Sequence, residues 1–215
     1  MLPIKIDNLS QYLKPPIGYR FDKGFTTTYS LHLDVLLTMP MFLDGRLAEE
    51  NAVLQNYVAV VKTINSFKDK FKVYVQKGEI QTSPLGSKKA SILYELLRDM
   101  IVEIPKEDSS FHPKLWLLRY ENEKHEKKYR LIIFSKNLTN SKDLDIAAVF
   151  DSIGNSNKHK KINKGLIKFK NSLNKKLFDD ELKNIEWEER NGYSLENFYV
   201  LPNKNSTLPF IKKIF

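Results

Sequence analysis

Apolar positions along the chain follow two spacings, which predict alternating strands and helices. Residues 25–31 are rich in β-branched and aromatic side chains and predict a strand. An apolar helical stretch follows from Leu33, and Pro40 is expected to bend or end it. Residues 49–67 carry apolar side chains at the helical period, and residues 71–75 predict the next strand. The first half of the chain therefore predicts strands joined by amphipathic helices.

The second half adds more strands than helices. A loop at residues 77–87 ends at Ser87, which is expected to cap a helix. One later amphipathic helix is predicted around Leu166 to Leu177. Four short apolar runs predict strands, at residues 101–104, 114–120, 129–134 and 146–150. The second run is apolar almost throughout, which is typical of a strand buried on both faces. The pattern favours the α/β class (mixed α+β), with a mixed sheet.

The chain divides into three segments by composition. Residues 1–24 contain several prolines and are interpreted as an irregular lead-in. Residues 25–155 hold the predicted strands, and residues 156–215 form a basic helical extension with an apolar C-terminal segment. There is no cysteine, so disulfides and thiolate metal sites are excluded. No apolar run is long enough to span a bilayer, and no signal peptide is recognised, so a cytoplasmic protein is expected.

Positive charge is concentrated late in the chain. The net charge is +9, and the stretch from Lys158 to Lys176 contains eight lysines and no acidic residue. Such a stretch attracts polyanions by releasing their counterions, although a merely solvated lysine face is the alternative. The candidate nucleic-acid-binding residues are Lys158, Lys160, Lys161, Lys164, Lys168 and Lys170.

Two pairs of polar residues flank the predicted buried strands. His112 and Lys114 begin one strand, and Ser135 and Asn137 end the next. Residues two apart in a strand share a face, so all four side chains can gather at one sheet edge if the strands are neighbours. Lysine, serine and asparagine can stabilise phosphate oxygens, and a neutral imidazole can attack phosphorus. This combination suits phosphodiester cleavage without a metal, and no cofactor is expected.

The His-x-Lys and Ser-x-Asn motifs, one strand apart, resemble those of the phospholipase D superfamily, in particular its nuclease and tyrosyl-DNA phosphodiesterase branches. The resemblance covers residues 25–151 and implies a sandwich with a central mixed sheet flanked by helices. It implies that His112 is the nucleophile or its acid/base counterpart, that Lys114 and Asn137 bind phosphate, and that Ser135 lies beside them. Asp145 stands where members carry an acid that orients the histidine.

The sequence departs from the family pattern in three ways. The family builds its site from two motifs, and this chain has one and no internal repeat. Phe134 replaces the usual glycine before the serine, and apolar residues replace the aspartate after the lysine. His125 and His159 also begin His-x-Lys triplets but lack a following Ser-x-Asn. His32 is interpreted as a packing residue, and Tyr29 either packs within its strand, which is favoured, or lines the site at the strand end.

The sequence therefore predicts a metal-independent phosphodiesterase, a nuclease that acts through a phosphohistidine, with DNA favoured over RNA as the expected nucleic acid. No membrane partner is expected. Because the chain has a single motif, a homodimer with the site on its two-fold axis is predicted. A module that binds nucleic acid without cleaving it is one alternative. The other is a half-site completed by a partner protein or by a missing C-terminal half.

Overall fold

The computed structural model describes residues 9–45, 57–82, 88–105, 110–140, 145–156, 160–178, 180–190 and 192–198. The chain divides into two compact units, Met1–Asp151 and Ser152–Phe215. The boundary between them lies inside strand β8, Ala147–Asn155. The division expected from composition, between residues 155 and 156, falls at the end of that strand.

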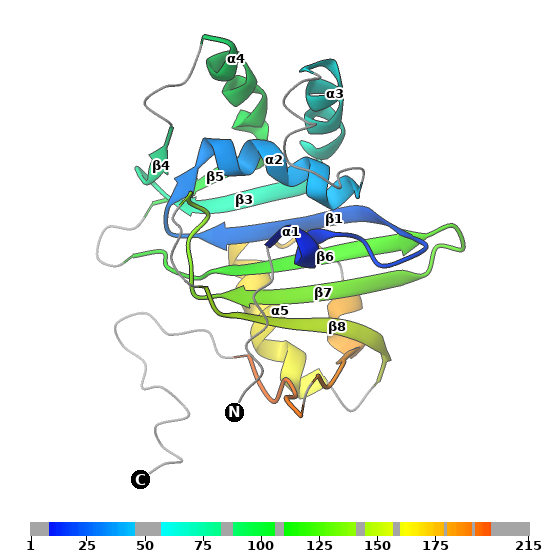
Figure 1. Ribbon diagram of the computed structural model, residues 1–215. Helices are drawn as coiled ribbons and strands as arrows, with labels where there is room; N and C mark the ends of the chain where they lie inside the picture. Colours follow the sequence, from blue (N-terminus) through cyan, green and yellow to red (C-terminus); the bar gives the residue numbers. More distant parts are fainter. Residues whose placement is uncertain are drawn as a thin grey trace. The chain divides into compact units, whose positions relative to one another are not determined.

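A mixed sheet forms the centre of the first unit, with the strand order β5-β3-β1-β6-β7-β8 (Figure 1). Strands β1, β3 and β5 are parallel neighbours, and β6, β7 and β8 continue the sheet in antiparallel pairs. The mixed α/β class predicted from the sequence is confirmed. The strands before β8 are β1 Tyr19–Thr28, β3 Phe71–Gln76, β5 Ile101–Ile104, β6 Leu115–Asn122 and β7 Lys127–Phe134.

Helices α2, α3 and α4 lie on one side of this sheet (Figure 1). The main apolar core forms where they meet the strands, around Ile64, Val73 and Trp116. Residues 115–120 of β6 are buried at every position, as predicted for a strand covered on both faces. The remaining elements of this unit are α1 Leu9–Leu13, β2 Leu31–His32, α2 Leu33–Asp44, α3 Tyr57–Phe67, β4 Ile80–Gln81, α4 Lys88–Leu97 and a 3-10 turn at Arg98–Met100.

The second unit pairs the last residues of β8 with β9 in antiparallel fashion. Its elements are α5 Lys160–Leu173, a 3-10 turn at Asp180–Asn184 and β9 Ile185–Trp187. The buried Asn163 side chain joins α5 to β9, since it donates to the Ile185 carbonyl and accepts the Trp187 indole N–H, each at 2.7 Å. Phe198 approaches α5 so closely that a Cβ on Gly165 would lie 1.6 Å from its carbonyl oxygen.

Two sequence-based predictions differ from the structure near the N-terminus. The lead-in is not irregular throughout, because α1 and the first half of β1 lie within it. Pro40 does not end α2, which continues to Asp44 and stops at Gly45, whose φ of 73° is left-handed. Pro40 removes one helical hydrogen bond, but it is buried on the apolar side of α2, where packing holds the helix together.

The predicted beginnings of two other helices fall outside the described residues. The helix predicted for residues 49–67 is seen as α3, and its predicted first part falls in the undescribed residues 46–56. The proposed cap at Ser87 also lies outside the described residues. The turn between β6 and β7 is shorter than the predicted strand limits of 114–120 and 129–134 imply, because both strands extend into it.

Candidate active site

Three strand ends meet at one edge of the sheet, because β6 is antiparallel to both β1 and β7. Thr27 at the end of β1 pairs with Leu115 at the start of β6, and Leu115 pairs with Ile133 near the end of β7. Segments that precede β6 and follow β7 are therefore neighbours in space. This edge carries the motif residues His112, Lys114, Ser135 and Asn137.

The His112 ring and the Lys114 ammonium are in direct contact. Lys114 Nζ lies 2.8 Å from Nδ1 and 3.2 Å from Nε2 of the ring. His112 is exposed, while Lys114 is half-buried, and this burial lowers the pKa of Lys114 from its ordinary 10.5. An ammonium donates to an imidazole nitrogen only when that nitrogen carries no proton. A ring nitrogen that accepts from Lys114 is therefore an unprotonated one, and an unprotonated ring nitrogen is what a nucleophile requires.

Asn137 is held by its side-chain oxygen. Oδ1 accepts the backbone N–H of Tyr29 at 3.2 Å and lies 3.4 Å from the Thr28 hydroxyl. The Thr28 hydroxyl in turn accepts the backbone N–H of Leu138 at 3.1 Å. These contacts orient the carboxamide, since a backbone N–H needs an oxygen acceptor. Nδ2 has no partner in the part of the chain that the structure describes, so it can donate to an anion.

Ser135 and Asp145 form a closed set of contacts. Asp145 Oδ1 accepts the Ser135 hydroxyl at 2.7 Å and the backbone N–H groups of Ser135 and Lys136 at 3.2 and 3.0 Å. The Ser135 oxygen also accepts the backbone N–H of Ile146 at 3.0 Å. The family resemblance implied that Asp145 orients the histidine, but here its carboxylate fixes the segment that carries Ser135. The Ser135 proton is already donated to Asp145.

Tyr29 contacts this group of residues, as in the less favoured of the two sequence-based alternatives for it. Its ring centroid lies 5.3 Å from that of His112, at an interplanar angle of 41°. Its hydroxyl donates to Glu79 Oε1 at 3.1 Å. That hydrogen bond, followed by the charge of Glu79 and slight desolvation, raises the pKa of Tyr29. The residue before His112 is held by a separate contact, because the backbone N–H of Phe111 donates to Gln76 Oε1 at 2.7 Å.

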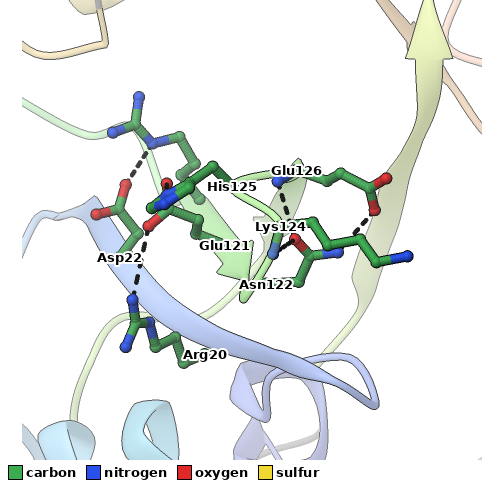
Figure 2. Close-up of polar contacts among 8 residues, drawn as sticks. Arg20, Asp22, Glu121, Asn122, Lys124, His125 and Glu126 are labelled. Atoms are coloured by element: carbon green, nitrogen blue, oxygen red, sulfur yellow. Dashed lines mark hydrogen bonds and ion pairs between the residues drawn. The ribbon is translucent and has the colours of Figure 1, made fainter.

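The other histidines lie in different settings. His125 is at the β6–β7 turn, at the opposite end of β6 from His112, and Figure 2 shows it beside Glu121. Its side chain is 79% exposed, so it is a solvated residue away from the motif. His32 is mostly buried, and its Nδ1 lies 3.3 Å from Asp34 Oδ2, so it is a satisfied packing residue. His159 lies outside the described residues.

The predicted lysine surface divides into two kinds of residue. Lys161, Lys164 and Lys168 are exposed at helical spacing on α5. Lys170 is only 4% exposed, and its ammonium donates to the carbonyls of Lys175 and Phe178, each at 3.1 Å. Its inclusion in an exposed phosphate-binding surface was therefore wrong, because it binds the backbone after α5. The side chains of Lys158 and Lys160 lie outside the described residues.

Neither a cluster of metal ligands nor a helix that could span a membrane is found among the described residues. Within the ranges that the structure describes, no three His, Asp or Glu side chains gather as metal ligands would. None of the described helices is both long and apolar enough to cross a membrane.

Comparison with known proteins gives matches only among solved structures. No protein-family model and no curated protein matches the chain. Yeast tyrosyl-DNA phosphodiesterase overlaps with a TM-score of 0.49 and 15% identity, over 81% of this chain and 37% of that one. A histidine-to-asparagine mutant of the yeast enzyme gives 0.47 and 16%, over 78% and 36%. The chain thus spans little more than a third of the length of these proteins.

Proposed function

We propose that this chain is a phospholipase D-like phosphodiesterase that cleaves nucleic acid without a metal. The supporting observation is the arrangement around Asn137, His112 and Lys114. The Asn137 oxygen is occupied by the Tyr29 N–H, so its amide hydrogens remain for a phosphate oxygen. The Lys114 ammonium lies against the imidazole, beside the atom that would attack. Two donors and one nucleophile therefore stand at the same sheet edge.

The proposed reaction has two displacement steps. A phosphate anion draws Lys114 Nζ toward its own oxygens, which frees a ring nitrogen of His112. That nitrogen attacks phosphorus, the bond to the leaving oxygen breaks, and the leaving oxygen takes a proton from a second acid/base group. Water then attacks the phosphohistidine, the P–N bond breaks, and the same group removes the water proton. Lys114 and Asn137 stabilise the charge that develops on the phosphate oxygens in both steps.

A second acid/base group is needed on the far side of phosphorus, and this chain carries one motif. We propose that a second copy supplies it, with His112 of each copy facing one phosphate across a two-fold axis. His112 and Ser135 are exposed at the sheet edge, which leaves them accessible to such a partner. A partner protein or a C-terminal half with its own motif would meet the same chemical need.

The preference for nucleic acid rests on charge. The exposed lysines of α5 present three positive groups along one helix, and their spacing suits a repeating phosphate backbone better than a single headgroup. We propose DNA as the first substrate to examine.

Cleavage of DNA, RNA and a chromogenic phosphodiester in EDTA tests the proposed function. We expect turnover in chelator, and we expect His112→Ala to lower it at least about 100-fold, as for loss of a nucleophile. The matched control is His125→Ala, which removes an exposed imidazole at the other end of β6. Cleavage that stops in EDTA and returns with Mg²⁺ would refute the metal-independent mechanism. Binding of DNA without cleavage would favour the binding module instead.

A further inference from the structure

Tyr29 is the residue that joins the two halves of the candidate site. Its ring lies against His112, which precedes β6, and its backbone N–H holds Asn137, which follows β7. Its hydroxyl reaches in a third direction to Glu79, beyond the end of β3. Side chain and backbone of one residue therefore contact the proposed nucleophile and one proposed phosphate donor.

Glu79 is itself held in place by backbone pairing. Its carbonyl accepts the Leu31 N–H at 2.9 Å, and its own N–H donates to the Gln76 carbonyl at 3.1 Å. Leu31 also pairs with Ile80 in the short β2–β4 sheet. The residue whose carboxylate accepts the Tyr29 hydroxyl is thus also hydrogen-bonded, through its backbone, to Leu31 just after Tyr29. This arrangement can restrain the tyrosine ring more firmly than an exposed flexible acid could.

The His112 side chain has few other restraints. It is exposed and precedes the first residue of β6, so rotation about its side-chain bonds is not blocked by a buried core. The carboxylate that the family pattern assigns to it, Asp145, instead accepts three hydrogen bonds from Ser135 and Lys136. Lys114 contacts the ring, but a bound phosphate would attract that ammonium away.

We propose that Tyr29, anchored by Glu79, is a positioning residue that sets the ring plane of His112 relative to Asn137. An attacking ring nitrogen must point at phosphorus within a narrow range of angles, and loss of that alignment reduces the rate. The aromatic face restricts the rotation of the imidazole, while the backbone N–H keeps Asn137 in register. The catalytic consequence rests on the proposed function, but the restraint on His112 does not.

The experiment compares three variants by two independent readouts. Tyr29→Leu removes the ring, Tyr29→Phe keeps it but loses the hydroxyl, and Glu79→Gln keeps an acceptor for that hydroxyl. All three retain the backbone N–H that holds Asn137, so thermal unfolding should show an intact fold. The first readout is the imidazole NMR spectrum. The chain has four histidines, so His112→Gln identifies the relevant signals. The second readout is kcat and KM on a chromogenic phosphodiester.

We expect Tyr29→Leu to shift the His112 ring-proton signals, because the ring current of the tyrosine is lost, while Glu79→Gln leaves them nearly unchanged. In Tyr29→Leu, kcat should fall about 10- to 100-fold with KM within about twofold, while Tyr29→Phe, which keeps the ring but loses its hydrogen bond to Glu79, should lose less of kcat. Unchanged His112 signals in folded Tyr29→Leu would overturn the inference. If the unmodified protein does not hydrolyse the substrate, the proposed function fails, and the NMR comparison still decides whether the Tyr29 ring lies against His112.

Discussion

At the scale of single residues, the two ends of the Asn137 carboxamide separate an internal contact from the proposed phosphate binding. Its oxygen accepts the Tyr29 N–H and its nitrogen has no partner among the described residues, so a change at the nitrogen alone leaves the internal contact in place. Aspartate has the same shape as asparagine and still offers an oxygen to the Tyr29 N–H, but it replaces the amide donor with a negative charge.

We therefore predict that Asn137→Asp folds normally and binds inorganic phosphate at least about tenfold more weakly, since a hydrogen bond to a charged group contributes about 1.5–3 kcal/mol. Titration of phosphate followed by NMR measures the change. Asn140→Asp is the matched control, because Asn140 is exposed and contacts His32 rather than Tyr29. Equal phosphate affinity in Asn137→Asp and the unmodified protein would exclude Asn137 from the phosphate site.

The lowered pKa of Lys114 gives a pH-dependent prediction. Burial disfavours the ammonium, so Lys114 loses its proton below its ordinary pKa of 10.5. The charged form is present below the lowered pKa and is lost as the pH rises through it. Phosphate affinity should therefore decline with rising pH before pH 10.5 is reached.

Lys114→Arg should remove this decline, because a guanidinium stays charged over the whole interval. Phosphate titrations at several values between about pH 7 and about pH 11 provide the measurement, since inorganic phosphate stays a dianion over most of that range. A decline of equal steepness in the Lys114→Arg variant would mean that another group controls the affinity.

The motif spacing was enough to identify the polar residues at this edge, but His112 and Lys114 precede β6 and Ser135 and Asn137 follow β7, so strand alternation is not what brings them together. It could not identify the role of Tyr29. Glu79 is 50 residues from Tyr29 in sequence, and Asn137 is 108 residues away, so these contacts depend on tertiary pairing. The same limit applies to Asp145, whose position after β7 was clear while its actual partner, Ser135, was not.

At the scale of elements, the strand predictions were accurate where apolar residues dominate. β3, β5 and β6 begin and end within a few residues of their predicted limits. The predicted start of β1 was too late, because charged residues interrupt the apolar pattern in the first part of the strand. Those residues pair across the sheet: Asp22 contacts Arg119, and Arg20 contacts Glu121 (Figure 2). Cross-strand ion pairs let a polar segment continue a strand, and periodicity alone does not show them.

Helix α5 provides a prediction about nucleic-acid binding. Replacing Lys161, Lys164 and Lys168 by glutamine should weaken DNA binding at every sequence, and each lost phosphate contact should reduce the log–log salt slope by about one unit. Binding measured by fluorescence anisotropy at several salt concentrations gives the slope.

The control removes the same charge elsewhere, at the exposed residues Lys62, Lys70 and Lys124. If both triple variants change the slope equally, only the net charge matters. If neither changes it, the exposed face of α5 is solvated and does not contact DNA.

At the scale of the whole molecule, the single motif predicts a phosphate-dependent dimer. Two Lys114 ammonium groups that face each other across a two-fold axis repel unless an anion lies between them. Phosphate or sulfate should therefore shift the chain toward a dimer that binds one anion per pair. Light scattering with and without phosphate, together with a calorimetric titration for stoichiometry, tests this. A monomer at all concentrations in both buffers would refute the dimer, and an active monomer would require another proton donor.

The pairing of β1 with β6 has a consequence for the order of events during protein synthesis. Thr26 and Leu115 are 89 residues apart, and Thr28 and Leu138 are 110 residues apart, yet each pair is joined by a hydrogen bond. The N-terminal residues of the site therefore leave the ribosome long before their partners exist, and contacts of this kind form late in folding. We expect a nascent or prematurely terminated chain that stops before Leu138 to expose His112 without the contacts that hold Asn137, and so to lack the proposed cleavage of nucleic acid.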